Sequence, residues 1–282
     1  MNTHTQAWQI KASTWLAAAA LAMAAMPANA QDRVPVTLSD PARPVTLRVS
    51  VLTGSITVKG ADTKEVIVEA RARVEEDGDR DRDRKRGNLR RLPMGSSGLT
   101  VEEENNTVRV STDSHQRAVD LTITVPRQTS VRLRSTNDGD IIVSNIEGEI
   151  DVNNTNGGVS VTNVAGSVVA HALNENVTVS LTRLNGKPMA FSSLNGDIDV
   201  TLPADLKANL TVKSDGDVFS DFDVQVAASA PQQTVEDARG KGGKYRVRIE
   251  KAVRGTINGG GPEIQFTNFN GDIFIRKAGS PR

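Results

Sequence analysis

The chain has 282 residues, in which 34 Lys+Arg balance 34 Asp+Glu, no residue is Cys, and 3% are aromatic. The neutral balance excludes the strong positive field with which proteins recruit nucleic acid or anionic lipid. The absence of Cys excludes disulfides and a lipid-modified N-terminal cysteine. Both tryptophans lie before residue 31, so the remaining Tyr and six Phe offer little for a sugar-binding cleft of stacked rings.

Residues 1–30 have the pattern of an export signal. Lys11 precedes an apolar run at residues 15–26, and Ala28-Asn29-Ala30 fits the small-x-small cleavage site. The run is shorter than the ~20 residues that a membrane span needs, and no other stretch approaches that length. We therefore expect a chain that starts near Gln31 and is soluble in the periplasm, outside the cell or at its surface, with no membrane span and no lipid anchor.

Almost every segment after residue 34 alternates between apolar and polar residues. Period-two runs occupy residues 45–51, 56–58, 66–70, 108–110 and 119–125, and β-branched side chains dominate them. Such alternation is typical of strands with one buried face, and β-branched residues suit a pleated, half-buried surface. The sequence after the signal therefore predicts an all-β protein.

Two stretches interrupt this pattern. Residues 75–98 carry acids first and bases afterwards, and residues 226–243 are small and polar. Both are predicted to be long surface loops within a single domain, 31–282. The bases of the first loop could bind an anionic envelope polymer, although a solvated spacer that cancels its own charge is the preferred interpretation. Those bases are Arg84, Lys85, Arg86, Arg90 and Arg91.

Residues 143–170 repeat a nine-residue unit, N-x-x-G-x-[I/V]-x-V. Its members are Asn145, Asn154 and Asn163, then Gly148, Gly157 and Gly166, with apolar positions in step. Asn-Gly turns between alternating runs are also a strong hairpin signal, which leaves an antiparallel meander as an alternative. Equivalent columns at a fixed offset favour a β-solenoid (β-helix-like) of short 9–10-residue units over 136–202, flanked by N-terminal strands. The period leaves open whether two or three units close one coil.

Turn residues continue beyond the repeat. Asp-Gly and Asn-Gly pairs precede short strands, because these residues tolerate the positive φ of tight turns. Their glycines include Gly139, Gly196, Gly216 and Gly271. The segments 124–140 and 201–217 also resemble each other, which indicates two copies of one corner followed by a strand.

Few residues are candidates for catalysis. His115 and His171 are the only histidines after the signal, and the nucleophile-elbow, zincin and P-loop motifs are absent. The stronger enzyme hypothesis is a polysaccharide-active β-helix that uses a pair of carboxylates. Asp197 and Asp199 flank the inward Ile198 and are expected to point outward on one face, while Asp140, Glu149 and Asp151 could lie on adjacent coils. Water-facing strand positions are polar for ordinary reasons, so we expect no enzyme activity.

The acids beside the turns also raise the question of calcium. Asp-Gly-Asp and Asn-Gly-Asp place carboxylates around glycines, and calcium-binding rolls share the period of nine. The paired glycines and the fixed Asp of those rolls are missing from consecutive units here. We therefore expect no bound metal and no cofactor.

The stretch SLNGDIDVTLPADLKANLTVKSDGDV (193–218), with FNGDIFIRK (269–277), resembles a bacterial β-strand-repeat family of unknown function. Members of that family are described as proposed adhesins, and the family is related to the auto-transporter adhesin head GIN domain. The resemblance covers most of residues 45–277 and is strongest in 136–218 and 261–277. It implies an exported solenoid-like fold and supplies no catalytic residues. We expect no membrane barrel after residue 277, unlike in an autotransporter.

The sequence as a whole predicts a non-enzymatic, exported module for binding or adhesion, or a scaffold, in the bacterial envelope. Its partner would be an envelope or extracellular protein or polymer, and not nucleic acid. One alternative is a structural protein that self-associates through unpaired terminal strands. The other is the polysaccharide-active enzyme.

Overall fold

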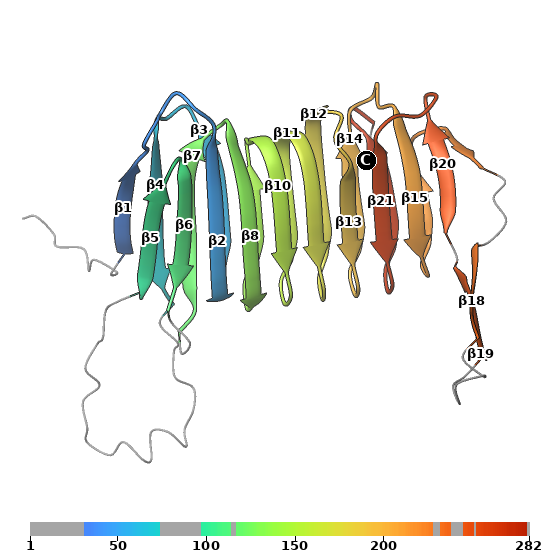
Figure 1. Ribbon diagram of the computed structural model, residues 1–282, viewed down its shortest axis with the longest axis horizontal. Helices are drawn as coiled ribbons and strands as arrows, with labels where there is room; N and C mark the ends of the chain where they lie inside the picture. The colour runs from blue at the N-terminus through green and yellow to red at the C-terminus, as the bar shows by residue number, and fades with distance from the viewer. Residues whose placement is uncertain are drawn as a thin grey trace, which may run out of the picture.

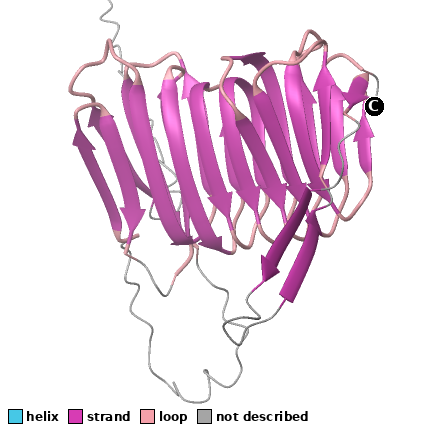
Figure 2. Cartoon of the chain, turned by 45° about the vertical axis from the view of Figure 1, so that its right-hand side comes forward, coloured by secondary structure: helices cyan, strands magenta, loops and turns pink. Residues whose placement is uncertain are grey.

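The computed structural model describes residues 31–73, 97–113, 117–227, 232–237, 245–250 and 252–280. These residues form strands and turns without any helix, which confirms the predicted all-β class. The strands stack side by side into a flattened coil with two sheet faces, a β-solenoid (Figures 1 and 2). No helix in the described ranges is long and apolar enough to cross a membrane.

One sheet, face A, lies toward the viewer in Figure 1. In stacking order it contains β5 (Leu99–Glu104), β6 (Thr107–Thr112), β2 (Val45–Thr53), β8 (Thr129–Asn137), β10 (Glu147–Asn154), the second half of β11 (Val159–Ala172), β13 (Met189–Ser193), β21 (Glu263–Asn268), β15 (Ala208–Ser214), β20 (Val253–Ile257) and β17 (Val224–Val226).

The opposite sheet, face B, continues each coil behind face A. Its stacking order is β1 (Gln31–Thr37), β4 (Glu65–Ala72), β7 (Val119–Pro126), β3 (Ile56–Ala61), β9 (Ile141–Ser144), the first half of β11, β12 (Val177–Leu184), β14 (Ile198–Leu202), β22 (Ile273–Lys277) and β16 (Val218–Ser220).

One coil of the central repeat takes 18 residues. Ile150 on β10 pairs with Val168 on β11, and Ile141 on β9 pairs with Val159 on β11, both in parallel register. Two nine-residue units therefore close a coil, with one unit on each face. Residues that stack in one column are therefore 18 residues apart and not nine. Successive nine-residue units lie on opposite faces, and their turns lie at opposite edges of the solenoid.

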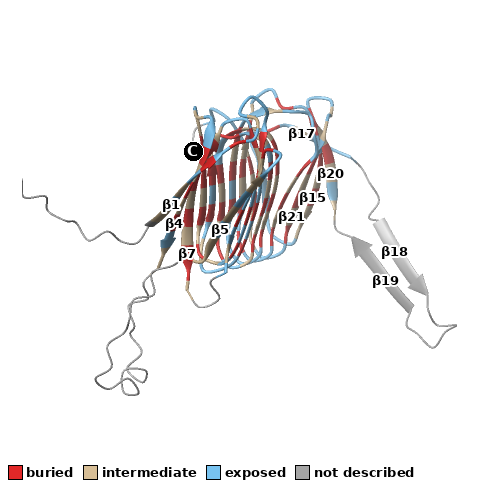
Figure 3. Ribbon diagram, turned by 60° about the vertical axis from the view of Figure 1, so that its left-hand side comes forward, coloured by how far each residue is buried: buried red, intermediate tan, exposed pale blue. Residues whose placement is uncertain are grey.

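The core lies between the two faces, where the buried hydrophobic residues form one cluster. Figure 3 marks the buried residues along the strands in red. Strand alternation places Val, Ile and Leu inward, as in the pattern of Leu47, Val49 and Val51 on β2. Full burial of such a side chain contributes about 1.5–3 kcal/mol. Repetition of this layer over many coils therefore stabilises a chain that has no disulfide.

The order of the coils in space differs from their order in the chain. The coil of β2 and β3 lies between β6/β7 and β8/β9, and the coil of β21 and β22 lies between β13/β14 and β15/β16. The two similar segments, 124–140 and 201–217, are the two places where the chain passes over an inserted coil. Pro126 ends β7 and Pro203 follows β14, since proline lacks the N–H needed to continue a ladder.

Antiparallel strands cover both faces at the N-terminal end of the parallel stack and face A at the other end, where face B ends in the parallel strand β16. At the N-terminal end β5 pairs with β6, and β4 and β1 follow β7. At the other end β20 pairs with β15, and β17 pairs with β20. The edge strand β1 contains Pro35, and β5 ends in three glutamates, Glu102, Glu103 and Glu104. Proline and charge are typical of edges protected against further strand pairing.

The expected signal peptide and most of the expected loop 75–98 lie outside the described residues. Within the expected loop 226–243, the structure contains β18 (Gln232–Asp237), which pairs antiparallel with β19 (Tyr245–Glu250). Backbone pairing supports this hairpin, which the small, polar composition of the segment did not indicate.

Arg73, at the end of β4, joins three segments. Its Nη2 and Nε lie 2.7 and 2.8 Å from the two carboxylate oxygens of Asp120, and its Nη1 lies 3.0 Å from Asp138 Oδ2. Asp120 also accepts the backbone N–H of Ser55 at 2.9 Å. Burial alone would raise the pKa of Asp120, but the hydrogen bonds from Arg73 and Ser55 outweigh it and lower that pKa.

Some glycines lie where the backbones of neighbouring coils come close together, so substituting them tests this packing. A Cβ on Gly157 would lie 2.1 Å from the carbonyl oxygen of Gly139, whereas a Cβ on Gly158 would meet nothing nearer than 3.5 Å. We expect Gly157→Ala to destabilise the fold by about 1–3 kcal/mol, the usual cost of overpacking. Gly158→Ala is the control and should stay within about 0.5 kcal/mol. Equal loss in thermal or urea unfolding of the two variants would contradict this packing.

The Arg73 cluster predicts a pH dependence. A lowered folded pKa means that the ionised Asp120 stabilises the fold above the ordinary value of 3.8 and loses this effect as pH falls through the folded value. Near neutral pH, Asp120→Asn should lower Tm by about 2–4 °C, the shift that ~1 kcal/mol produces in a domain of this size.

The difference in Tm between parent and Asp120→Asn should shrink below about pH 3.8, measured by thermal melts across pH. Asp223→Asn, at an exposed position near the far end of the solenoid, controls for the loss of one negative charge. A Tm difference that stays constant down to strongly acidic pH would refute the role given to the ionised Asp120.

Candidate functional site

The turn acids form a column along one edge of the solenoid, just before the face B strands. The backbone N–H of Gly158 donates to Asp140 Oδ1 at 2.8 Å, and that of Asp272 donates to Asp197 Oδ1 at 2.9 Å. Asp217 N–H donates in turn to Asp272 Oδ1 at 3.0 Å. Each of these carboxylates accepts a backbone donor from the next coil, which gives Asp a structural reason to follow Gly in these turns.

Asparagines form a second column at the same edge. Asn156 donates to Asn137, Asn174 to Asn156, Asn195 to Asn174, and Asn270 to Asn195, over 2.7–3.1 Å between side-chain amides. An amide carries both a donor and an acceptor, so a stacked column can bond in both directions. These bonds account for the Asn of the Asn-Gly turns.

The opposite edge holds a different column. Asn163 donates its Nδ2 to Asn145 Oδ1 at 2.5 Å, and both residues have positive φ, 53° and 58°. Asn154, although nine residues from each, lies at the first edge, where it is buried and donates to the carbonyl oxygens of Gly139 and Gly158. Asn154 therefore stabilises the backbone at this edge through its side-chain hydrogen bonds, and it is not a turn residue with positive φ.

The glycines expected at turns lie where backbones of adjacent coils meet. Gly148 pairs directly with Gly166, which has a φ of 136°. The remaining expected positions stack in the same way: a Cβ on Gly139 would lie 2.3 Å from Gly54, on Gly196 2.3 Å from Glu175, on Gly271 2.6 Å from Gly196, and on Gly216 2.2 Å from Gly271.

The carboxylates of the enzyme hypothesis are engaged in other contacts. Asp199 on β14 receives two hydrogen bonds from Arg276 Nε on β22, at 2.8 and 2.9 Å, and Asp197 belongs to the turn column. Asp151 pairs with Arg132 at 2.9 Å on face A. His171 lies on face A beside Ser192 of the next coil, and His115 lies outside the described residues. In the described ranges, no three His, Asp or Glu side chains are grouped to hold a metal ion.

The bases expected to meet an anionic polymer, from Arg84 to Arg91, fall outside the described residues. The strands of face A do place other arginines together. Arg109, Arg48 and Arg132 are directly opposed on β6, β2 and β8. Arg109 pairs with Glu104 at 3.6 Å and Arg132 with Asp151, so acids neutralise both ends of this row.

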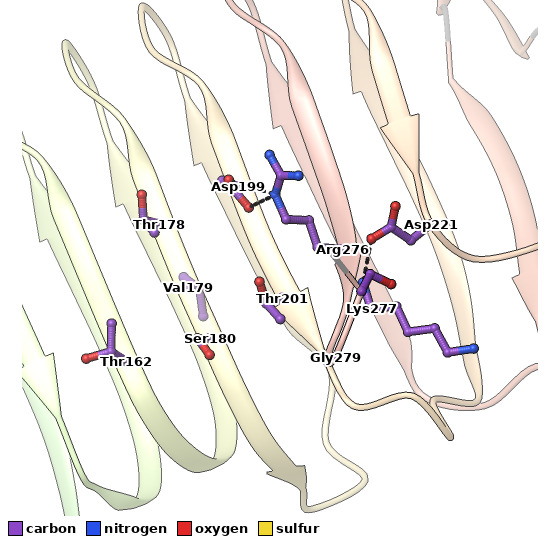
Figure 4. Close-up of a pocket in the computed structure, with 11 residues that line it drawn as sticks. Thr162, Thr178, Val179, Ser180, Asp199, Thr201, Asp221, Arg276, Lys277 and Gly279 are labelled. Carbon is purple, nitrogen blue, oxygen red and sulfur yellow. Dashed lines mark hydrogen bonds and ion pairs between the residues drawn. The ribbon is translucent and has the colours of Figure 1, made fainter. Parts of the chain in front are cut away.

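Face B has a hollow of about 250 Å³ on its outer side, over β11, β12, β14 and β22 (Figure 4). Strand alternation turns the hydroxyls of Thr178, Ser180 and Thr201 outward into it. The Asp199–Arg276 ion pair borders these hydroxyls, and the C-terminal segment at residues 277–280 forms a wall. The hydrogen bond with Asp199 raises the pKa of Arg276, so this guanidinium remains charged.

An aromatic pair lies next to this hollow. Phe219 on β16 and Phe274 on β22 stack with centroids 5.3 Å apart and planes at 11°, and the Arg276 guanidinium carbon lies 5.2 Å from the centre of the Phe274 ring. The count of aromatic residues in the sequence gave no sign of this pair. Only the outward direction of Phe274 could be predicted from the sequence, because alternation in Ile273-Phe274-Ile275 turns the Phe away from the core.

Comparisons with known proteins find similar solved structures, among them two that are each 11% identical to this chain. One is a proposed cell adhesion protein from Clostridium sporogenes ATCC 15579, with a TM-score of 0.46 over 88% of this chain and 99% of that chain. The other is a proposed adhesin from Bacteroides fragilis NCTC 9343, with a TM-score of 0.33 over 88% and 96%. No curated protein matches the sequence significantly.

A family model matches the part of the chain from within β8 to β20. The match covers residues 133–258, which include the whole stretch 136–218 where the resemblance is strong but not residues 261–277. It confirms that resemblance and indicates no enzyme family. Residues 133–258 are thereby identified as a match to the family described as Toastrack DUF4097.

Proposed function

We propose that the protein is an exported, non-enzymatic binding module of the bacterial envelope, which presents the outer surface of a rigid solenoid to a partner. The observation that carries this proposal is face B. Its outward side chains stand in rows fixed by parallel backbone pairing, with Thr178 opposite Asp199 and Ser180 opposite Thr201. Polar groups held at fixed spacing are suited to recognition, because little side-chain freedom is lost on binding.

The state of the carboxylates supports a non-catalytic role. A glycosidase needs one acid with a raised pKa and a second free carboxylate at a defined distance. Asp199 is held by Arg276, and Asp197 accepts a backbone N–H. Both carboxylates are therefore engaged in contacts between neighbouring coils and are not free to serve as the pair that hydrolysis needs.

Export is supported by the signal pattern of residues 1–30, whose expected cleavage site directly precedes Gln31. Self-association through the N-terminal end is the weaker alternative, since Pro35 on β1 and the glutamates of β5 oppose strand addition at that end.

Cell fractionation followed by protease treatment of intact cells tests this function. We expect a protein recovered outside the cytoplasm, with an intact mass that begins at Gln31, and its digestion by protease added to intact cells. A full-length cytoplasmic chain that retains residues 1–30 would refute export. Protection from protease with release on osmotic shock would place the protein in the periplasm and replace adhesion by an internal envelope partner.

A further inference from the structure

Three large apolar side chains form a row on the outside of the solenoid, at the edge that carries the Asn and Asp columns. Leu173, Leu194 and Phe269 are 42%, 39% and 58% exposed. Each directly follows the buried last residue of a face A strand, in β11, β13 and β21, so alternation turns all three outward. Single exposed apolar residues are ordinary, whereas a contiguous group of them is typical of an interaction site. We call these three residues the apolar row.

The apolar row crosses three adjacent coils, at the lower edge of Figure 1. The parallel registers align the last residues of β11, β13 and β21, so the residues that follow them are neighbours as well. The carbonyl oxygen of Leu173 accepts the peptide N–H of Asn195 at 3.0 Å. That of Leu194 accepts the peptide N–H of Asn270 at 2.8 Å. The backbones of neighbouring members are therefore fixed about 4.8 Å apart, the spacing of paired strands.

Acids surround the apolar row. The turns at residues 137–140, 155–158, 173–176, 194–197 and 269–272 contain no Lys or Arg, and their acids are Asp138, Asp140, Glu175, Asp197 and Asp272. Arg73 pairs with Asp138, and within the described part of the chain the other four acids form no ion pair with a base. This edge is therefore negatively charged, although the chain as a whole is neutral.

The acids restrict what can cover the apolar row. A second copy docked edge to edge would bring like charges together, and an anionic lipid surface would be repelled. Strand addition is also unsuited to this place, because the row crosses the ends of paired strands and presents no open strand edge. A partner segment with both apolar and basic residues is complementary to the row and to the charge beside it.

The spacing of the row favours a helical partner segment. Side chains on one side of a strand recur about every 6.6 Å, whereas those on one side of an α-helix recur about every 5.4 Å, one turn apart. The spacing of about 4.8 Å between coils is closer to the helical repeat. A helix lying across the coils would thus place one apolar side chain on each member of the row.

We propose that this edge of the solenoid binds a basic amphipathic α-helix of a partner protein. The apolar stripe of the helix packs on Leu173, Leu194 and Phe269. Its Lys or Arg side chains face Glu175 and Asp197, which follow the apolar row within the same turns. This inference rests on the proposed function, because it names the partner class of the binding module.

Fluorescence anisotropy with the purified protein tests this surface. The probe is a labelled peptide of Leu and Lys, with Leu at the helical positions i, i+3, i+4 and i+7. A scrambled peptide of the same composition and a Leu–Glu peptide with the same pattern are the peptide controls. We expect the parent to bind the patterned Leu–Lys peptide most tightly, and salt to weaken this binding. Leu194→Ser, Phe269→Ser and Glu175→Lys should each weaken it about tenfold.

Two variants are matched controls. Leu52→Ser removes a Leu that is also 39% exposed at this edge, but its neighbour on the coil of β8 is Thr136, so it stands alone. Asp223→Lys makes the same charge change as Glu175→Lys at the opposite edge. Both should bind the peptide like the parent, and melting curves should show that every variant is folded. Equal affinity for the three peptides, or equal losses in Leu194→Ser and Leu52→Ser, would overturn the proposal.

Photocrosslinking in intact cells identifies the natural occupant, with a photoreactive amino acid in place of Leu194 and, as the control, of Leu52. A crosslink from position 194 to a basic segment with helical apolar periodicity would support the proposal. A crosslink to lipid, to a second copy or to an acidic segment, or none above the level at position 52, would overturn it. Failure of peptide binding leaves export and the binding-module function standing. A cytoplasmic location would instead refute the proposed function without deciding whether this edge binds a basic helix.

Discussion

In-register parallel pairing between coils is the constraint on which the rest of the structure depends. Adjacent strands lie about 4.8 Å apart, and the turns must keep the same spacing as the strands. Where the backbones of two turns touch, as at Gly216 and Gly271, a Cβ has no room. The same spacing lets identical side chains bond to one another, which is why Asn174 meets both Asn156 and Asn195. The turn composition that suggests metal ligands in the sequence is a consequence of stacking.

The insertion of remote coils gives this regular stack its individual features. A solenoid built in chain order would place β15 directly on β13, and its face B would lack β22 between β14 and β16. Because β22 enters from the C-terminal part of the chain, Arg276 comes to lie beside Asp199, 77 residues earlier. The same insertion brings Phe274 next to Phe219. The candidate site is therefore a product of topology as much as of local sequence.

The repeat made the solenoid predictable, because a nine-residue period with Gly148 and Gly166 in step is typical of stacked coils. It could not reveal the 18-residue coil, since Asn154 and Asn163 look alike in sequence and differ only in the edge they occupy. The stacking order was also out of reach, because an open parallel edge accepts any strand of suitable length. Pro126 and Pro203 marked the two crossings, but a proline shows where a strand ends and not where the next one goes.

The aromatic residues illustrate a second limit on predicting the site from the sequence. A count of Trp and Tyr described what the chain lacks, whereas recognition depends on where the few rings lie. Phe274 stands between two buried isoleucines, so its outward direction follows from alternation alone, but its partner Phe219 is brought beside it only by strand pairing. The Asp199–Arg276 pair links both arguments. The contact that occupies the Asp199 carboxylate also holds the Arg276 guanidinium over the Phe274 ring, and a donor fixed in this way is suited to recognition because little side-chain freedom is lost on binding.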